Sequence, residues 1–156
     1  MSLSLHTNHG TIKILLTSTS DVALNFMALA AAGVYDNTVF HKSVPEFILQ
    51  GGDPEGTGKG GLTSYTGEPL VARKTASKEY KKGSVFMAGK ADSVGSQFFI
   101  TYSEQELDFH CFGHVQSLDV LEKIEKLAVD KKNRPIDPVR IERVQIHANP
   151  FAIPNP

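Results

Sequence analysis

The chain has 156 residues, a formal net charge of −1, 40% hydrophobic residues and 21% charged residues. These values are typical of an ordinary globular domain, and a chain of this length buries enough surface to fold without a disulfide or a metal. They exclude a disordered chain, a collagen-like chain, a coiled coil and a polycationic surface that would bind nucleic acid through its phosphates. We therefore expect a single domain over residues 1–156.

The first forty residues predict a hairpin followed by a helix. Apolar and polar residues alternate on both sides of the turn sequence Asn8–Gly10, as in two antiparallel strands joined by a tight turn. Residues 22–30 then place apolar side chains at helical spacing. Ser20 or Asp21 can cap the start of this helix, and Gly33 can end it.

The middle of the chain predicts short strands separated by loops. Residues 51–67 hold seven of the 13 glycines and form a long loop, and loops of this length in compact domains are usually functional or mobile. A polar loop is expected at Gly89–Gly95. The expected strands, all rich in apolar residues, are Thr38–His41, Phe47–Gln50, Ser84–Ala88, Gln97–Tyr102 and Cys111–Val115.

A second helix is expected near the C-terminal end of the chain. Ser117 can cap its start, and Leu121 and Ile124 belong to its inward face. Pro135 follows the helix and prevents it from continuing.

The last strand contains a signal for a bulge. Val139 and Ile141 have one parity along the strand, whereas Val144 and Ile146 have the other. A β-bulge near Glu142–Arg143 would turn all four side chains inward. Many short strands with only two helices favour a closed antiparallel β-barrel that the helices cap.

Some features of the sequence do not carry the chemistry that they suggest. The glycines around Lys59 lack the spacing of a phosphate-binding Walker loop, and no helix follows them as in a dinucleotide fold. His110 and His114 flank Cys111 at the start of a predicted strand, and strand geometry would place them about 13 Å apart, too far for one metal ion. The basic clusters at residues 78–82 and 131–134 are typical of a solvated surface. We therefore expect no metal, no cofactor and no direct binding of nucleic acid.

Cysteine usage and the N-terminus predict a compartment. Cys111 is the only cysteine, so no internal disulfide can form, which is typical of a reducing environment. It lies among apolar residues and is expected to be an inert thiol rather than a nucleophile. The sequence begins without the basic and apolar regions of a signal peptide, and its longest apolar run is shorter than a membrane span. We expect a protein of the cytoplasm or nucleus that makes no membrane contact.

Two glutamines lie on apolar faces of predicted strands. In strand geometry Ile48 and Gln50 share one face, as do Gln97 and Phe99. A single glutamine in such a position is more often a core amide whose hydrogen bonds are satisfied within the fold. Two of them beside apolar side chains and the cation of Lys42 indicate an apolar slot with a few directed donors, which is the usual make-up of a ligand-binding site.

Three segments of the sequence resemble the cyclophilin family of peptidyl-prolyl cis-trans isomerases. They are residues 40–61 (FHKSVPEFILQGGDPEGTGKGG), residues 95–101 (GSQFFIT) and residues 112–115 (FGHV), and the likeness spans nearly the whole chain. The ending at residues 146–151 (IHANPF) is similar to the small single-domain branch called cyclophilin-like 3. The resemblance implies a mainly β fold, a closed eight-stranded antiparallel β-barrel capped by two α-helices.

The family's activity is rotation about the X-Pro bond of proline-containing peptides and protein clients. Amide resonance opposes this rotation by ~18–20 kcal/mol, and the catalysis requires no covalent intermediate. The resemblance implies that Lys42, at the position of the family's arginine, is the catalytic donor and that Gln50 helps to orient it. The implied substrate-binding residues, which form the apolar slot and the groove beside it, are Phe47, Ile48, Ala88, Gly89, Gln97, Phe99, Leu107 and His110.

Several positions depart from the family pattern. Lys42 replaces the arginine, and because an ammonium lacks the planar fork of a guanidinium, we expect reduced isomerase activity. Gly89 replaces an asparagine, and Glu46 replaces a glycine beside the slot. Glu106 stands where archetypal members have a tryptophan that contacts the drug cyclosporin, so we expect weak cyclosporin binding.

The alternative is a proline-recognition module with little catalytic activity. The cyclophilin-like 3 branch is associated with the spliceosome, so this alternative implies spliceosomal proteins as partners in a larger assembly. Lys42 is the residue that supports this alternative, because an apolar slot without an efficient donor would still bind X-Pro peptides. In either case we expect a monomer.

Overall fold

The computed structural model describes residues 1–17, 20–60, 79–90, 93–107 and 110–148. Among these residues, neither helix has the length and apolar character that crossing a membrane requires. The elements in chain order are β1 (Ser2–Thr7), β2 (Gly10–Leu16), α1 (Asp21–Ala31), β3 (Thr38–Val39), β4 (Lys42–Val44), β5 (Ile48–Gly51), β6 (Glu79–Tyr80), β7 (Ser84–Lys90), β8 (Ser93–Thr101), β9 (Gln105–Glu106), β10 (Cys111–Val115), α2 (Asp119–Glu125) and β11 (Arg140–Ala148).

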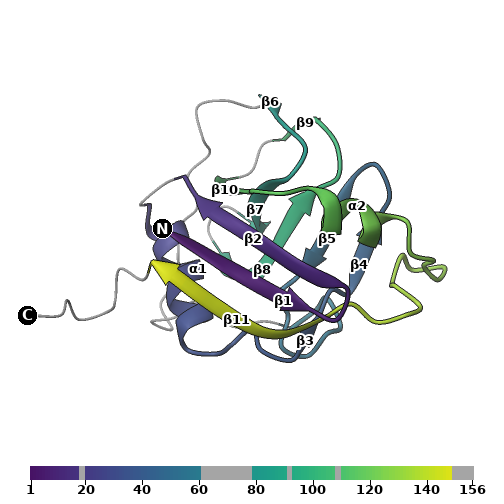
Figure 1. Ribbon diagram of the computed structural model, residues 1–156, viewed down its shortest axis with the longest axis horizontal. Helices are drawn as coiled ribbons and strands as arrows, with labels where there is room; N and C mark the ends of the chain where they lie inside the picture. Colours follow the sequence, from purple (N-terminus) through teal and green to yellow (C-terminus); the bar gives the residue numbers. More distant parts are fainter. Residues whose placement is uncertain (18–19, 61–78, 91–92, 108–109, 149–156) are drawn as a thin grey trace, which may run out of the picture.

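Nine strands form one curled antiparallel sheet in the order β3-β11-β1-β2-β10-β7-β8-β5-β4 (Figure 1). The edge strands β3 and β4 follow each other in the chain, so residues 38–44 connect the two edges. If β3 and β4 are counted as one interrupted strand, the sheet has the expected eight strands. The expected mainly β fold with two helices is therefore confirmed. The strands β6 and β9 form a separate pair that the sequence did not predict.

The main core fills the inside of the curled sheet, and α1 covers it. Ser20 caps α1 by accepting a hydrogen bond from the Ala23 N–H at 3.3 Å. Phe26 of α1 is fully buried, and its ring lies 5.2 Å from the ring of Phe98 and 4.9 Å from that of Phe112. Such tilted and edge-on aromatic contacts stabilise the packing beyond the area that they bury.

The expected bulge is present in β11. His6 of β1 pairs with Arg143, but the next residue, Thr7, pairs with Ile141, so Glu142 is skipped in the ladder. The parity of the strand changes at this point. As a result Ile141 is buried, and Val144 also packs against the same core.

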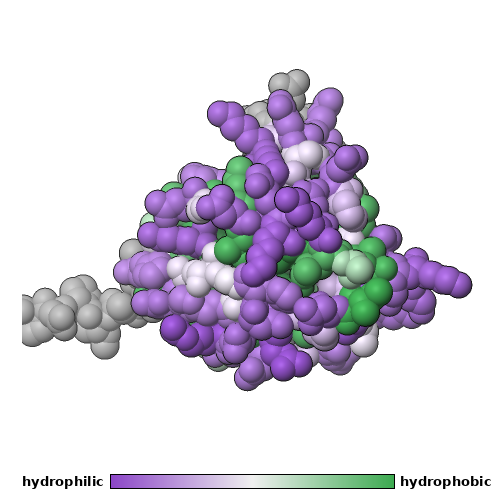
Figure 2. Space-filling model, turned by 45° about the vertical axis from the view of Figure 1, so that its right-hand side comes forward, coloured by the Kyte–Doolittle hydropathy of each residue, from purple (hydrophilic) through white to green (hydrophobic). Residues whose placement is uncertain are grey.

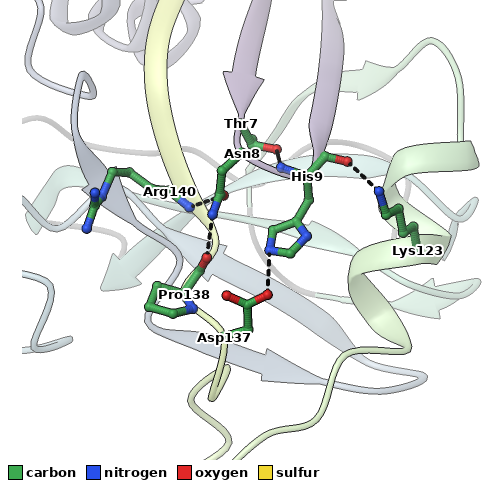
Figure 3. A network of polar contacts seen from close by, with 7 residues as sticks. All are labelled: Thr7, Asn8, His9, Lys123, Asp137, Pro138 and Arg140. Carbon is green, nitrogen blue, oxygen red and sulfur yellow. Dashed lines mark hydrogen bonds and ion pairs between the residues drawn. The ribbon is translucent and has the colours of Figure 1, made fainter.

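The turn between β1 and β2 is bound to the start of β11 and to α2 (Figure 3). The Asn8 side chain donates to the Pro138 carbonyl and accepts from the Arg140 N–H, both at 2.8 Å. The His9 carbonyl accepts from Lys123 of α2 at 3.4 Å, and His9 Nε2 lies 3.5 Å from an Asp137 carboxylate oxygen. These contacts join three segments that are distant in the sequence.

Three details differ from the sequence predictions. The strand expected at Thr38–His41 ends at Val39. The loop expected at Gly89–Gly95 is mostly strand, because β7 and β8 stay paired through residues 90 and 93. Ser117 does not cap α2, since Leu118 occupies that position and makes no side-chain capping bond. Residues 61–67 of the predicted glycine-rich loop lie outside the described residues.

Candidate active site

One row of side chains crosses five neighbouring strands on the face of the sheet opposite the main core. Residues that pair across neighbouring strands lie side by side on the same face. Their neighbours along the strands, such as Leu49 and Phe98, belong to the main core. The row, which begins with a cation and an amide and continues with two aromatic rings and a thiol, is Lys42, Gln50, Phe99, Phe86 and Cys111.

An apolar cluster forms around the middle of this row, separate from the main core. Its buried members are Ile48, Phe86 and Phe99, and the rings of Phe86 and Phe99 are stacked with centroids 5.1 Å apart. The ring of Tyr80 meets Phe86 edge-on at 4.8 Å. The partly buried members of the cluster are Tyr80, Ala88, Leu107 and Cys111. Four residues of the predicted slot and groove therefore come together here, namely Ile48, Ala88, Phe99 and Leu107.

Phe47 lies outside this cluster. Its side chain is 40% exposed, and it directly precedes Ile48 at the end of a turn. An exposed aromatic ring next to a buried apolar cluster is available for contact with a ligand. Figure 2 shows that apolar surface gathers in patches on the side of the molecule that carries α2 and β4.

The two glutamines are joined to each other and to the glycine-rich loop. Gln50 Nε2 donates to Gln97 Oε1 at 3.0 Å. Gln97 Nε2 donates to the carbonyls of Gly58 and Gly60 at 3.2 and 2.8 Å. The loop in turn surrounds the Asp53 carboxylate, which accepts from the N–H groups of Gly58 and Gly60 at 2.8 and 3.0 Å. The described part of this loop thus holds Gln97 in place.

The Asp53 carboxylate is ionised inside the loop. Burial favours its neutral form, but hydrogen bonds from the backbone N–H groups of Glu55, Gly60 and Gly58 outweigh burial and lower its pKa. A Cβ atom at Gly60 would lie 2.5 Å from Glu55 Oε2 and 2.6 Å from Asp53 Oδ1, so a larger residue would push these carboxylates aside. Close packing at Gly60 and the positive φ angles of Gly56 and Gly58 thus explain part of the run of glycines noted in the sequence.

Lys42 is partly buried at the cationic end of the row. Within the described ranges its ammonium makes no hydrogen bond or ion pair.

The neighbouring His41 was not predicted as a site residue. Burial lowers the pKa of His41; Asp53 opposes this effect, while Arg134 and Lys42 add to it. The neutral ring lies against Gly58, where a Cβ atom would be 3.0 Å from His41 Cδ2.

The ladder between β7 and β8 shifts at Ala88. Gly89 pairs with Val94 and not with Ser96, as the preceding pairs would require. The extra residues bulge from β8 beside Gln97 and leave Ala88 without a cross-strand partner of its own. Such irregularities are common next to active sites, where they redirect side chains.

His110 and Cys111 follow each other but have different surroundings. The His110 ring lies with Nε2 3.0 Å from the Ser20 hydroxyl at the start of α1, and the His110 carbonyl accepts from the Met87 N–H of β7 at 3.3 Å. Burial raises the pKa of the Cys111 thiol, which agrees with the predicted inert thiol. Of the predicted site residues, Ile48, Ala88, Phe99 and Leu107 thus meet in the apolar cluster. Sequence patterns did not predict the other members of this cluster, because strand pairing brings in Phe86 and Cys111, and ring packing on Phe86 brings in Tyr80. In the described parts of the chain, no three His, Cys, Asp or Glu side chains are grouped as a metal site would require.

Known proteins share this sequence pattern and fold. A model of the cyclophilin type peptidyl-prolyl cis-trans isomerase family matches residues 2–146. The chain belongs to this family. It is 43% identical to peptidyl-prolyl cis-trans isomerase CYP18-1 of Arabidopsis thaliana over 97% of this chain and 99% of the relative. It is 42% identical to the isomerase-like 3 protein of Gallus gallus, over 98% of this chain and the whole relative. This cyclophilin therefore also resembles the predicted branch.

Solved cyclophilins have the same fold. A crystal structure of a Cryptosporidium parvum cyclophilin type isomerase matches 96% of this chain and 98% of its own, with a TM-score of 0.86 and 38% identity. A structure of that protein in the presence of the dipeptide Ala-Pro matches with a TM-score of 0.80, covering 96% of this chain and all of that one at 37% identity.

Proposed function

We propose that this cyclophilin isomerises X-Pro bonds on the outer face of β5 and β8, with Lys42 as the donor. The observation that carries this proposal is the row that sets a cation, an amide and an apolar ring side by side. A proline isomerase must bind the twisted bond more tightly than either planar form. It can do so with an apolar surface for the proline ring and a donor at the atoms whose electron density changes during rotation.

Each part of the site has a proposed role. The proline ring packs against Ile48, Phe99 and Leu107, while Phe47 covers one side. The backbone at Ala88 and Gly89 pairs with the residues before the proline, as an added strand would. Gln97 binds in the same groove, and His110 lies at its far edge.

The proposed role of Gln50 is to orient Lys42. Because its Nε2 donates to Gln97, its Oε1 is left to accept a hydrogen bond from the Lys42 ammonium and so orient it.

A lysine offers fewer directed donors than the family's arginine and must shed tightly bound water. Loss of one charge-assisted hydrogen bond in the transition state costs about 1.5–3 kcal/mol, or about 10- to 150-fold in rate. We therefore propose reduced activity.

The test compares three forms of the protein on one X-Pro peptide after their thermal midpoints are shown to be equal. Lys42→Arg should raise kcat/KM about tenfold or more, equivalent to at least ~1.4 kcal/mol. Lys42→Ala should lower it, because the slot alone desolvates the bond without supplying a donor. Equal kcat/KM values in all three forms would remove Lys42 from the mechanism.

A second candidate is a proline-binding module in a larger, spliceosomal assembly. Lys42 favours it, because binding needs the apolar cluster but not an efficient donor. This candidate requires a nuclear location, whereas the isomerase alone fits the cytoplasm or the nucleus. Retained peptide affinity with no measurable catalysis by the wild-type protein would select it. In both cases we propose a monomer that binds X-Pro peptides directly and binds cyclosporin weakly.

A further inference from the structure

Glu46 occupies a backbone position that suits glycine. The Phe47 N–H donates to the Val44 carbonyl at 2.9 Å and closes a four-residue turn in which Pro45 is second and Glu46 third. The φ angle of Glu46 is +66°. The third position of this kind of turn prefers glycine, because a Cβ atom disfavours the left-handed conformation. A glutamate there persists only if its surroundings hold it.

Three hydrogen bonds hold the main chain of Glu46 from two sides. Its N–H donates to Glu125 Oε2 of α2 at 2.7 Å. Its carbonyl accepts from the Ser103 hydroxyl at 2.5 Å and from Gln105 Nε2 at 3.1 Å. Helix α2 thus holds one side of the turn, and residues 103–105, which lead from β8 into β9, hold the other.

The turn fixes the main chain of Phe47. The Phe47 N–H closes the turn, and its carbonyl accepts from the Tyr102 N–H at 2.9 Å. Both main-chain groups of Phe47 are therefore fixed, while its ring, directly before Ile48 of the apolar cluster in the chain, stays 40% exposed. A change in the Glu46 conformation would move this ring, because the two residues share a peptide bond.

We propose that Glu125 is a positioning residue of the isomerase site, acting through Glu46 to hold Phe47 in the place where it contacts the substrate. The inference rests on the proposed function, because Phe47 is assigned to the substrate there. Glu125 itself does not touch the substrate. A carboxylate suits this role, since its hydrogen bond to a backbone N–H is charge-assisted and stronger than a neutral one.

The test measures peptide affinity and the exchange rate of the bound X-Pro bond by NMR, with an Ala-Pro-containing peptide. Glu125→Ala should weaken affinity about three- to tenfold and change the rate on the enzyme by less than twofold, because Phe47 binds ground and transition states alike. Glu125→Gln should lose less than twofold in affinity, since its amide oxygen still accepts the same N–H in a weaker, neutral hydrogen bond. The matched control is Glu142→Ala, which removes an exposed carboxylate on β11 and should have no effect.

A second variant separates positioning from general stability. Glu46→Gly should restore the affinity of Glu125→Ala, because glycine adopts the positive φ angle without being held. Should Glu125→Ala not fold, Glu125→Asp serves in its place with the same expected rescue.

Wild-type affinity in Glu125→Ala, or a loss that Glu46→Gly does not restore, would overturn the inference and leave the proposed function intact. A wild-type protein that neither binds nor isomerises the peptide would instead overturn both.

Discussion

Phe99 links the polar and apolar parts of the row, because it pairs with Gln50 on one side and stacks on Phe86 on the other. Its side chain is only 4% exposed. We expect Phe99→Ala to lower the free energy of unfolding by about 3–5 kcal/mol, through lost burial and a residual cavity. Urea unfolding measures this loss. Phe47→Ala is the control, since its exposed ring should affect stability little while peptide affinity falls.

Glu106 determines the expected response to cyclosporin. It is exposed in β9, directly before Leu107 of the apolar cluster. A carboxylate there must lose water when an apolar drug binds, and it offers neither the indole N–H nor the apolar face of a tryptophan. We expect weak binding by calorimetry and tighter binding after Glu106→Trp. Nanomolar affinity in the wild-type protein would contradict this argument.

At the scale of elements, the described part of the glycine-rich loop is built around one buried charge. The pKa of Asp53 is lower in the folded protein than its ordinary value of 3.8. The ionised carboxylate therefore stabilises the fold above about that pH, and the contribution disappears as the pH falls through the lower, folded-state pKa. Because the same loop holds Gln97, loss of this charge should also disturb the site.

We expect Asp53→Asn to lower the free energy of unfolding at pH 7 by about 1.5–3 kcal/mol, because one amide oxygen cannot accept all the N–H groups that face it. The difference from wild type should shrink as the pH falls below 3.8. Denaturant unfolding between pH 7 and pH 2.5 measures it. A difference that stays constant over this range would show that the carboxylate charge does not stabilise the loop.

At the scale of the whole molecule, the curled sheet separates the candidate site from the main core. Strands β4, β5, β8, β7 and β10 carry the row on their outer face, whereas β1 and β11 lie elsewhere in the sheet. An X-Pro peptide should therefore shift the amide signals of residues 47–50 and 97–99 in an NMR titration and leave those of residues 3–5 unchanged. Shifts confined to the basic segments at residues 81–82 and 131–134 would place the ligand elsewhere.

Patterns within one segment were enough to predict most of the elements. Helix α1 follows from its apolar spacing and from Ser20, and the bulge in β11 follows from the change of parity between Ile141 and Val144. The motif at residues 40–61 also identified the family and, through it, Lys42 and Gln50. These signals are local, because backbone chirality gives helices and strands fixed periods that a single segment displays.

Only the tertiary structure decided how distant strands align. The row from Lys42 to Cys111 depends on four ladder registers, two of which join strands that are not consecutive in the chain, β5 with β8 and β7 with β10. A shift of one residue in any of these registers would turn side chains to the other face. The same holds for the Gln50–Gln97 bond and for the contact of Glu125 with Glu46. The sequence by itself determined which side chains are present and which local structures they form. Long-range packing determined which of them meet, because register is set by the burial of both faces at once and not by any one segment.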